Sequence, residues 1–255
     1  MKLVCMTQVY NQNTIVGPDG KTNIVRFMES ISQYCDGLVV FDDGSTDGSR
    51  DVITSFSGDF ELEIPSNSIN APEYEGYHRA RSLQHCMRLE ADWVVAIDPD
   101  EVLEKRAEQG GLRATLESLS DDISAVGFYK KELWRSDRYV RVDGAWAHSL
   151  EVRAFRLTDT LCYDERASYR SELIPYNVIP PYSKSTLGLL HYAYINDAAI
   201  LEKYNRWLSL GLNISDELND DDLRLSDVNP KWFGENWPTG PGIGACDMQV
   251  SRMLA

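Results

Sequence analysis

The sequence predicts an α/β protein, an αβα sandwich with a mostly parallel central sheet. Short apolar runs alternate with segments of helical periodicity through the first 104 residues, which is the pattern of successive βαβ units. Apolar residues make up 43% of the 255 residues, and this share is sufficient for a sizeable core in one large domain.

Three apolar runs, at residues 3–6, 38–41 and 93–97, are expected to form buried strands. The third run is apolar throughout, as in a sheet that is covered on both faces. Between these runs, apolar residues recur at helical spacing and predict three helices, the second capped by Asp47 or Ser49. The apolar stripes are Ile24, Phe27, Met28 and Ile31, then Val52, Ile53 and Phe56, then Ala80, Leu83, Met87 and Ala91.

The second half of the chain is less regular. Residues 125–129 and 152–157 are expected to be strands. Asn196 or Asp197 can cap a further helix that ends at Gly211. An acidic stretch and a loop rich in Trp, Gly and Pro follow, without an internal repeat or a clear linker. A single domain with a loop-rich C-terminal third is therefore expected.

Charge, hydropathy and cysteine content narrow the function classes. The net charge of −15 disfavours a nucleic-acid partner, since like charges repel. No apolar run approaches the ~18 residues of a membrane span. The apolar N-terminus is interrupted at Gln8 and is too short for a secretory signal. The five cysteines form no C-x-x-C pair, so reduced thiols and a cytoplasmic location are expected.

Polar groups follow each of the three predicted N-terminal strands, at residues 8–12, 42–45 and 98–101. Ligands of open α/β sheets bind at these carboxyl ends. Asp98 and Asp100 are two residues apart, so their carboxylates can converge on one cation, for which Mg²⁺ or Mn²⁺ is suited. Such a cation would neutralise a diphosphate leaving group. The alternative is a solvated acidic turn.

Residues 42–48 are dense in turn formers and partly match an EF-hand loop. The twelfth loop position is Thr54 and not the bidentate Glu of that motif, and no helix precedes the loop. A calcium loop is therefore rejected. A carboxylate at this strand end can accept from a uracil imide N–H or from ribose hydroxyls.

Four segments together resemble the family 2 glycosyltransferases, which have the GT-A fold. Residues 39–49 are similar to the family's nucleotide-binding signature, and residues 6–12 are similar to its first strand and loop. Residues 76–82 resemble its Gly-x-x-x-Ala-Arg-Asn segment, and residues 93–101 resemble its strand that ends in the DxD metal motif. All four occur in the family's order.

The resemblance implies roles at matching positions. Asp42 and Asp43 would hold uracil or ribose, and Arg81 would approach the base or the diphosphate as a fixed cation. Asp98 would lie near ribose and metal, and Asp100 would ligate the metal. The segment of the first strand and its loop would line the donor pocket through Thr7, Val9, Tyr10 and Asn11. The departures are Gln12 in place of an acidic residue, Ser82 in place of Asn, and an insertion at residues 17–20.

The second half resembles a bacterial subgroup of the family at residues 151–156, an Arg-x-Phe-Arg strand. In that subgroup a His-Glu pair follows, and Ser171-Glu172 stands at its place here. An inverting transfer needs a base for the acceptor proton, and Glu172 is the candidate. Glu151 and Asp143 are the alternatives, as is a structural role for Glu172.

His191 lies in a His-Tyr pair that resembles a motif of related GT-A enzymes, in which the histidine completes the metal shell. A purely structural histidine is the alternative. His148 is a candidate for acceptor contact. Residues 232–238, rich in Trp and Gly, are a candidate lid.

The resemblance implies a metal-dependent, inverting glycosyltransferase that moves a sugar from a nucleotide-diphosphate sugar, with a UDP-sugar favoured, to a glycan or other hydroxyl-bearing acceptor. Mn²⁺ or Mg²⁺ would be the cofactor. Residues 1–104 would be the nucleotide-binding half, 105–210 the acceptor half and 211–255 a tail. Two alternatives are kept. One is a sugar-phosphate nucleotidyltransferase, although residues 8–13 lack its Gly and cations; the other is a non-catalytic nucleotide-sugar or glycan-binding protein.

Overall fold

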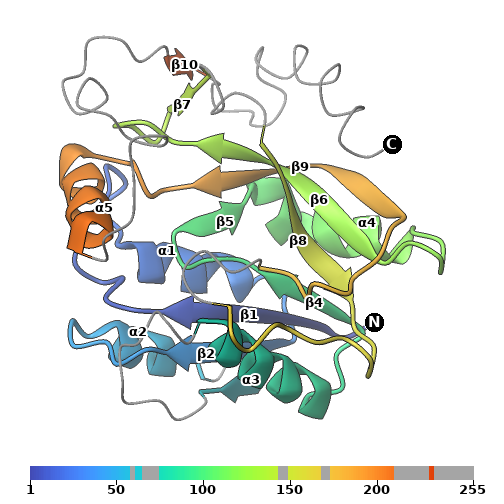
Figure 1. Cartoon of the computed structure of the whole chain (residues 1–255). Coiled ribbons are helices and arrows are strands. Elements are labelled where there is room, and N and C mark those ends of the chain that lie inside the picture. Colours follow the sequence, from blue (N-terminus) through green and yellow to red (C-terminus); the bar gives the residue numbers. More distant parts are fainter. Residues whose placement is uncertain (58–60, 65–74, 143–148, 168–172, 210–229, 233–255) are drawn as a thin grey trace.

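The computed structural model describes residues 1–57, 61–64, 75–142, 149–167, 173–209 and 230–232 (Figure 1). Within these ranges, eight strands form one sheet in the order β3-β2-β1-β4-β8-β6-β9-β5. A separate antiparallel pair joins β7 (Tyr139–Arg141) to β10 (Pro230–Trp232). The predicted α/β class is confirmed.

The first half of the sheet is parallel and follows the sequence pattern. Strands β1 (Leu3–Val9), β2 (Gly37–Asp42), β3 (Glu61–Glu63) and β4 (Trp93–Ala96) pair in parallel. The helices between them are α1 (Asn23–Ile31), α2 (Ser49–Ser55) and α3 (Glu75–Arg88). The three predicted strands and three predicted helices are therefore confirmed.

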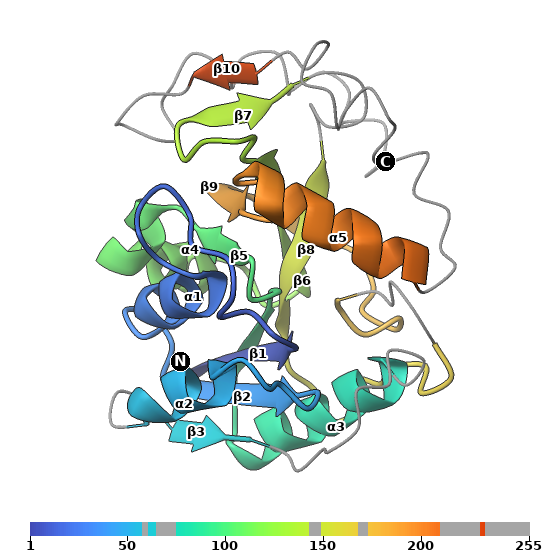
Figure 2. The same cartoon turned by 90° about the vertical axis from the view of Figure 1, so that its left-hand side faces the viewer.

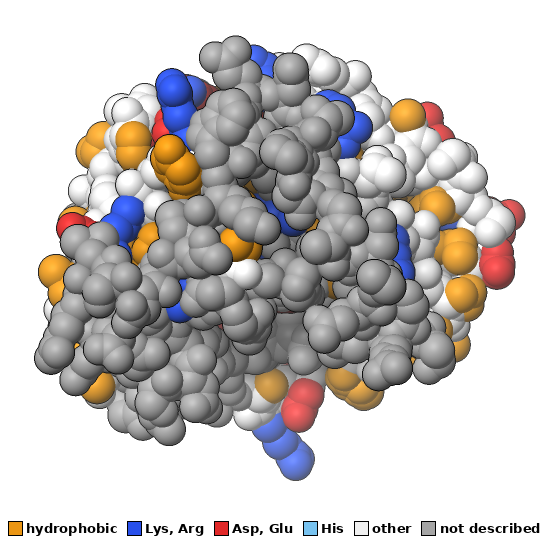
Figure 3. Space-filling view, turned by 90° about the horizontal axis from the view of Figure 1, so that it is seen from above, with side chains coloured by type: hydrophobic (Ala, Val, Ile, Leu, Met, Phe, Trp, Pro, Cys, Tyr) orange, Lys and Arg blue, Asp and Glu red, His pale blue; other side chains and the backbone are white. Residues whose placement is uncertain are grey.

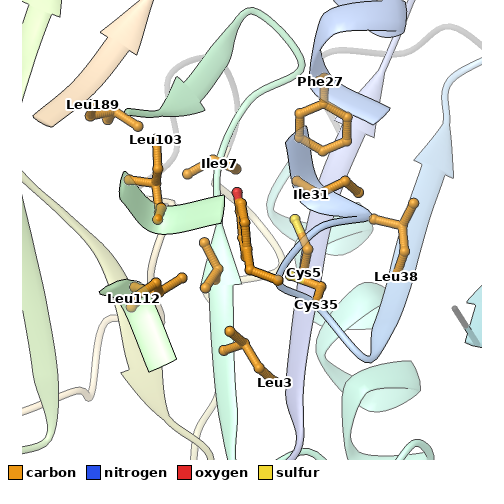
Figure 4. Close-up of a cluster of buried hydrophobic side chains, with 14 of the residues drawn as sticks. Leu3, Cys5, Phe27, Ile31, Cys35, Leu38, Ile97, Leu103, Leu112 and Leu189 are labelled. Carbon is orange, nitrogen blue, oxygen red and sulfur yellow. The ribbon is translucent and has the colours of Figure 1, made fainter. Parts of the chain in front are cut away.

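Alternation along β1 divides the core into two layers. Leu3 and Cys5 pack with Phe27 of α1 on one face (Figure 4), whereas Val4 and Met6 pack with α3 on the other. Successive side chains of a strand point to opposite faces, so an uninterrupted apolar run serves a strand that is covered on both sides.

The second half of the sheet mixes directions. Strand β8 (Leu150–Arg156) runs antiparallel to both β4 and β6 (Ala125–Glu132), and β6 is parallel to β9 (Tyr182–His191). Strand β5 (Glu101–Leu103) is antiparallel to β9. The described sheet thus has four parallel and three antiparallel pairs, and it remains mostly parallel as predicted. A π-helical turn, η2 (Ala107–Gly111), leads into α4 (Leu112–Glu117).

Helix α5 (Asp197–Ser209) crosses in front of β6 and β8 in the view of Figure 2. The Asn196 side chain accepts a hydrogen bond from the Ala199 amide at 2.9 Å, which confirms the predicted cap. The predicted stop at Gly211 lies outside the described residues. No described helix has the length and apolar content that a membrane span requires.

The insertion at residues 17–20 anchors the start of α5. Arg26 of α1 forms an ion pair with Asp19 at 2.7 Å, and its guanidinium stacks 3.9 Å from the centroid of the Tyr192 ring. The Asn196 amide donates to the Val16 carbonyl at 3.0 Å. The corner between β9 and α5 is thereby attached to the loop that follows β1.

Charged side chains are spread over the surface. Seen from above, the described Lys and Arg side chains lie at several separate places on the face that Figure 3 shows. A nucleic-acid footprint is a cluster or stripe of such cations. The described part of this face shows no such cluster.

Candidate active site

A cleft of about 320 Å³ opens at the carboxyl ends of β1 and β4. The loop after β1, the turn after β4, the start of α3 and one side of α5 form its walls. This is the position at which α/β sheets bind ligands. Six residues predicted as site residues line it: Val9, Tyr10, Asn11, Asp43, Asp98 and Asp100.

The loops after β1 and β2 are joined into one unit by side-chain hydrogen bonds. The Asn11 amide N–H donates to Ser45 Oγ at 3.0 Å, and the Thr46 N–H donates to Asn11 Oδ1 at 2.8 Å. The Asn13 N–H donates to Asp47 Oδ2 at 2.6 Å. Asn11 has a φ of 48°, a conformation that Asn tolerates better than most residues. These short polar residues therefore shape the cleft wall.

Asp42 and Asp43 have different positions. Asp43 lines the cleft, with Oδ1 4.0 Å from His78 Nδ1, and the His78 ring stacks on Phe41. Asp42 is buried outside the cleft lining, where it accepts a hydrogen bond from the Ser45 N–H at 3.1 Å. Adjacent strand residues point to opposite sides, so only one of the two can face the ligand. Asp42 accepts within the turn in this structure, and its donor contact stays a prediction.

Arg81 and Thr7 also do not line the cleft. Arg81 is exposed on α3 and donates to Gln84, whereas Arg79 is buried, lines the cleft and lies 3.9 Å from Asp98 Oδ1. Residues two apart on a helix point in nearly opposite directions. The spacing of buried Gly76, Arg79 and Ala80 could have identified the inward face. Thr7 is buried within β1.

The Asp98-Pro99-Asp100 segment forms a tight corner between β4 and β5. The Glu101 N–H donates to the Asp98 carbonyl at 2.9 Å, and the Asp98 N–H donates to Glu101 Oε2 at 3.2 Å. Glu101 is itself fixed by two hydrogen bonds from Arg153, at 2.9 and 3.0 Å. Burial and the carboxylate of Glu101 raise the pKa of Asp98 to about 6, against the opposing charge of Arg79.

His191, at the end of β9, is not part of the cleft lining, but it contacts Asp100, which is. Its Nε2 lies 3.4 Å from Asp100 Oδ2, and its Nδ1 contacts Glu132. Burial alone would lower the pKa of His191, but the carboxylates of Glu132 and Asp100 outweigh it and raise that pKa to about 9. Burial would raise the pKa of Asp100, yet the charge of His191 holds it well below its usual range.

Asp100 and His191 fit as two ligands of a divalent cation whose remaining coordination positions would be filled by substrate and water. No described group of three or more His, Cys, Asp or Glu residues could hold a metal alone. Two neighbouring ligand atoms of an octahedral Mg²⁺ lie about 3 Å apart, and Asp100 Oδ2 and His191 Nε2 lie 3.4 Å apart. Such cations keep water and take phosphate oxygens as further ligands. The two residues could therefore supply the protein's share.

Charged residues of α5 also line this cleft. They are Glu202, Lys203 and Arg206. The Arg206 guanidinium lies 5.3 Å from the centroid of the Tyr10 ring. The sequence predicted the helix but not this role. The Lys and Arg three residues apart share one helix face and were the available signal.

Several predicted residues cannot be placed in the site. Glu172, Asp143, His148 and residues 233–238 lie outside the described residues. Glu151 is on β8, outside the cleft lining, where it pairs with Arg153 at 3.1 Å and with Lys130 at 3.6 Å. In this structure Glu151 is thus an ion-pair partner of two cations and does not face the cleft as a catalytic base would.

The fold has close structural relatives but no sequence relatives among those compared. No family model and no curated protein sequence matches this chain. S. aureus TarS 1-349 superposes with a TM-score of 0.54 at 15% identity, over 87% of this chain and 77% of that one. Its complex with UDP-GlcNAc gives 0.53 at 15% identity, with the same coverage. A longer S. aureus TarS structure has a TM-score of 0.52 at 14% identity, over 87% of this chain and 46% of that one.

The chain therefore has the GT-A glycosyltransferase fold, as the sequence motifs predicted. It spans less than half the length of the longer TarS structure. At these identities the likeness concerns the arrangement of the chain, and activity must be argued from the cleft.

Proposed function

We propose that this protein is a metal-dependent glycosyltransferase that moves a sugar from a nucleoside-diphosphate sugar, with a UDP-sugar favoured, to an acceptor hydroxyl. One observation carries the proposal. The cleft brings Asp43, Asp98 and Asp100 from two strand ends to one place, and Lys203 and Arg206 of α5 line the same cleft. A GT-A relative, S. aureus TarS 1-349, has been crystallised with UDP-GlcNAc, which supports the donor class.

The nucleoside would bind near the loops after β1 and β2. Asp43 can accept from the imide N–H of uracil, which has a donor between two carbonyl oxygens. Tyr10 offers an aromatic face for the base, and Asn11 lines the same wall. Asp98 can accept from ribose hydroxyls.

The diphosphate would lie between the Asp100–His191 corner and α5. Asp100 and His191 would hold a cation, and when bound it would neutralise the charge of the departing diphosphate. Lys203 and Arg206 add fixed positive charge on the α5 wall of the cleft, where an anion gains most from preorganised cations. Acidic residues alone would repel the negatively charged diphosphate, so the proposed cation and the positive side chains of α5 are both needed to bind it.

The transfer itself is proposed to invert the anomeric carbon. The acceptor oxygen attacks that carbon, the bond to the diphosphate oxygen breaks, and Glu172 takes the acceptor proton. Glu172 remains a proposal from sequence resemblance. Glu172→Gln should lose transfer while retaining UDP binding.

The decisive test of the proposal is UDP release from a panel of UDP-sugars with mixed glycan acceptors and Mn²⁺. Asp100→Ala should lower the rate at least about 100-fold, because a substrate-binding cation loses a charged ligand. Asp121→Ala, at a fully exposed position, is the matched control and should retain the rate. Undiminished release by Asp100→Ala, with wild-type metal affinity, would contradict the site.

The same reagents address the two alternatives. Pyrophosphate release from a nucleoside triphosphate and a sugar phosphate would indicate a nucleotidyltransferase. UDP binding without turnover on any acceptor would indicate a binding protein. The neutral loop of residues 8–13, joined to the next loop by hydrogen bonds, offers no cation for a triphosphate.

A further inference from the structure

A ring of charged side chains lies behind the Asp98–Asp100 corner. It runs through four neighbouring strands and closes because Glu101 follows Asp100 in the chain. Its members, called the charged ring below, are Asp100, His191, Glu132, Lys130, Glu151, Arg153 and Glu101. No local sequence pattern predicts this ring, since its partners are as far apart in the chain as Asp100 and His191.

The strand register brings the ring together. Glu101 of β5 and Glu132 of β6 both pair with His191 of β9, one on each side. On β6, Lys130 lies 3.0 Å from Glu132 and 3.6 Å from Glu151 of β8. Cross-strand neighbours on one face are close enough for such pairs. The ring is therefore a consequence of the mixed second half of the sheet.

Glu132 has a distinct place in this ring. Its side chain is 5% exposed and is not part of the cleft lining, but it contacts His191 Nδ1. It thus touches a candidate metal ligand without reaching the substrate space. Lys130, 3.0 Å from Glu132, compensates the charge of this buried carboxylate.

We propose that Glu132 is a positioning residue for the divalent cation. It accepts the Nδ1–H of His191, so that the Nε2 lone pair is directed at the space beside Asp100. This inference rests on the proposed metal dependence. A neutral imidazole ligates through one nitrogen while the other carries the proton, and a carboxylate on that proton fixes both the tautomer and the ring orientation.

The rest of the ring supports the same geometry from the other side. Arg153 joins Glu151 to Glu101, and Glu101 accepts from the Asp98 N–H within the corner. The Tyr192 N–H donates to the Asp100 carbonyl at 2.7 Å. Both ligand-bearing segments are therefore fixed by buried partners, with the two candidate donor atoms 3.4 Å apart.

The test is a titration of the full-length chain with Mn²⁺ in the presence of UDP, followed by electron paramagnetic resonance of free Mn²⁺. Glu132→Ala should weaken Mn²⁺ binding about 10- to 100-fold, the usual effect of losing such a partner. Glu132→Gln should lose less, because its amide oxygen still accepts from Nδ1–H. Glu104→Gln is the matched control, a buried carboxylate paired with Arg106, and should retain wild-type affinity.

A second measurement separates positioning from general damage. Imidazole nitrogen favours Mn²⁺ over Mg²⁺, so Glu132→Ala should reduce the ratio of the two affinities toward that of His191→Ala. Equal weakening of both ions, or unchanged Mn²⁺ binding, would overturn the role of Glu132. If Asp100→Ala also binds Mn²⁺ normally, the metal site and with it the metal-dependent function fail. If Asp100→Ala loses Mn²⁺ binding while Glu132→Ala keeps it, only the positioning role of Glu132 is refuted. Glu132→Gln preserves side-chain volume, so the comparison holds even if Glu132→Ala does not fold.

Discussion

The two halves of the sheet build their sides of the cleft with different interactions. In the parallel half, short side chains such as Asn11 and Asp47 bond to backbone N–H groups of the neighbouring loop. In the mixed half, charged side chains on different strands pair with one another, as Arg153 does with Glu101. The first arrangement is local and tolerates change, whereas the second depends on every partner because an unpaired buried charge is costly.

The sharpest test of this difference is Arg153→Ala. The substitution leaves Glu101, only 2% exposed, without the two hydrogen bonds from Arg153 and should destabilise the fold by about 3–5 kcal/mol. Urea denaturation at neutral pH measures the loss. Arg138→Ala, at a side chain 71% exposed, should change stability by less than about 0.5 kcal/mol. Equal effects of the two variants would show that the ring is not a stability element.

A smaller effect is expected on α3, where two arginines are two residues apart. Arg79→Gln should weaken UDP binding about tenfold, a change of about 1.4 kcal/mol, because Arg79 lines the cleft. Arg81→Gln should bind as the wild type does, since Arg81 faces solvent. Isothermal titration calorimetry with UDP and Mn²⁺ compares them. The opposite ranking would mean that the helix presents its other face to the ligand.

The smallest effect is expected in the loop after β1. Asn11→Gly preserves the positive φ but loses the acceptor of the Thr46 N–H, at a cost of about 0.5–1.5 kcal/mol. Asn11→Ala loses the acceptor and adds backbone strain of about 1 kcal/mol or more. Thermal unfolding should rank the wild type above Asn11→Gly and Asn11→Ala lowest. An Asn11→Gly variant as stable as the wild type would show that the two loops hold together without this bond.

The parallel half could be predicted almost entirely from the sequence, because its signals are short-range. Apolar runs, helical stripes and the polar residues at strand ends all lie within a few positions of one another, and the corner at Asp98 follows directly from the strand before it. The motifs there do not specify which side chain faces inward. They name both Asp42 and Asp43, of which Asp43 lines the cleft, and they name Arg81, whereas Arg79 lines the cleft.

The mixed half could be predicted only in outline. No strand is predicted at β9 (Tyr182–His191), because residues 183–186 are consecutive polar residues. Glu132, Lys130 and Arg153 are ordinary charged residues in the sequence, and only strand pairing brings them together. Long-range register is fixed by the whole sheet, so no local pattern could reveal the charged ring or its contact with His191.

The loop that contains residues 17–20 fixes the start of α5 at one point. The Asn196 side chain is bonded there to the Val16 carbonyl, and Arg206 lies ten residues further along the helix. With a rise of ~1.5 Å per residue, that stretch of helix is about 15 Å long, so a tilt of only about 5° carries Arg206 through roughly 1.3 Å. A modest pivot at one tethered turn is thus sufficient to widen or narrow the mouth above Tyr10.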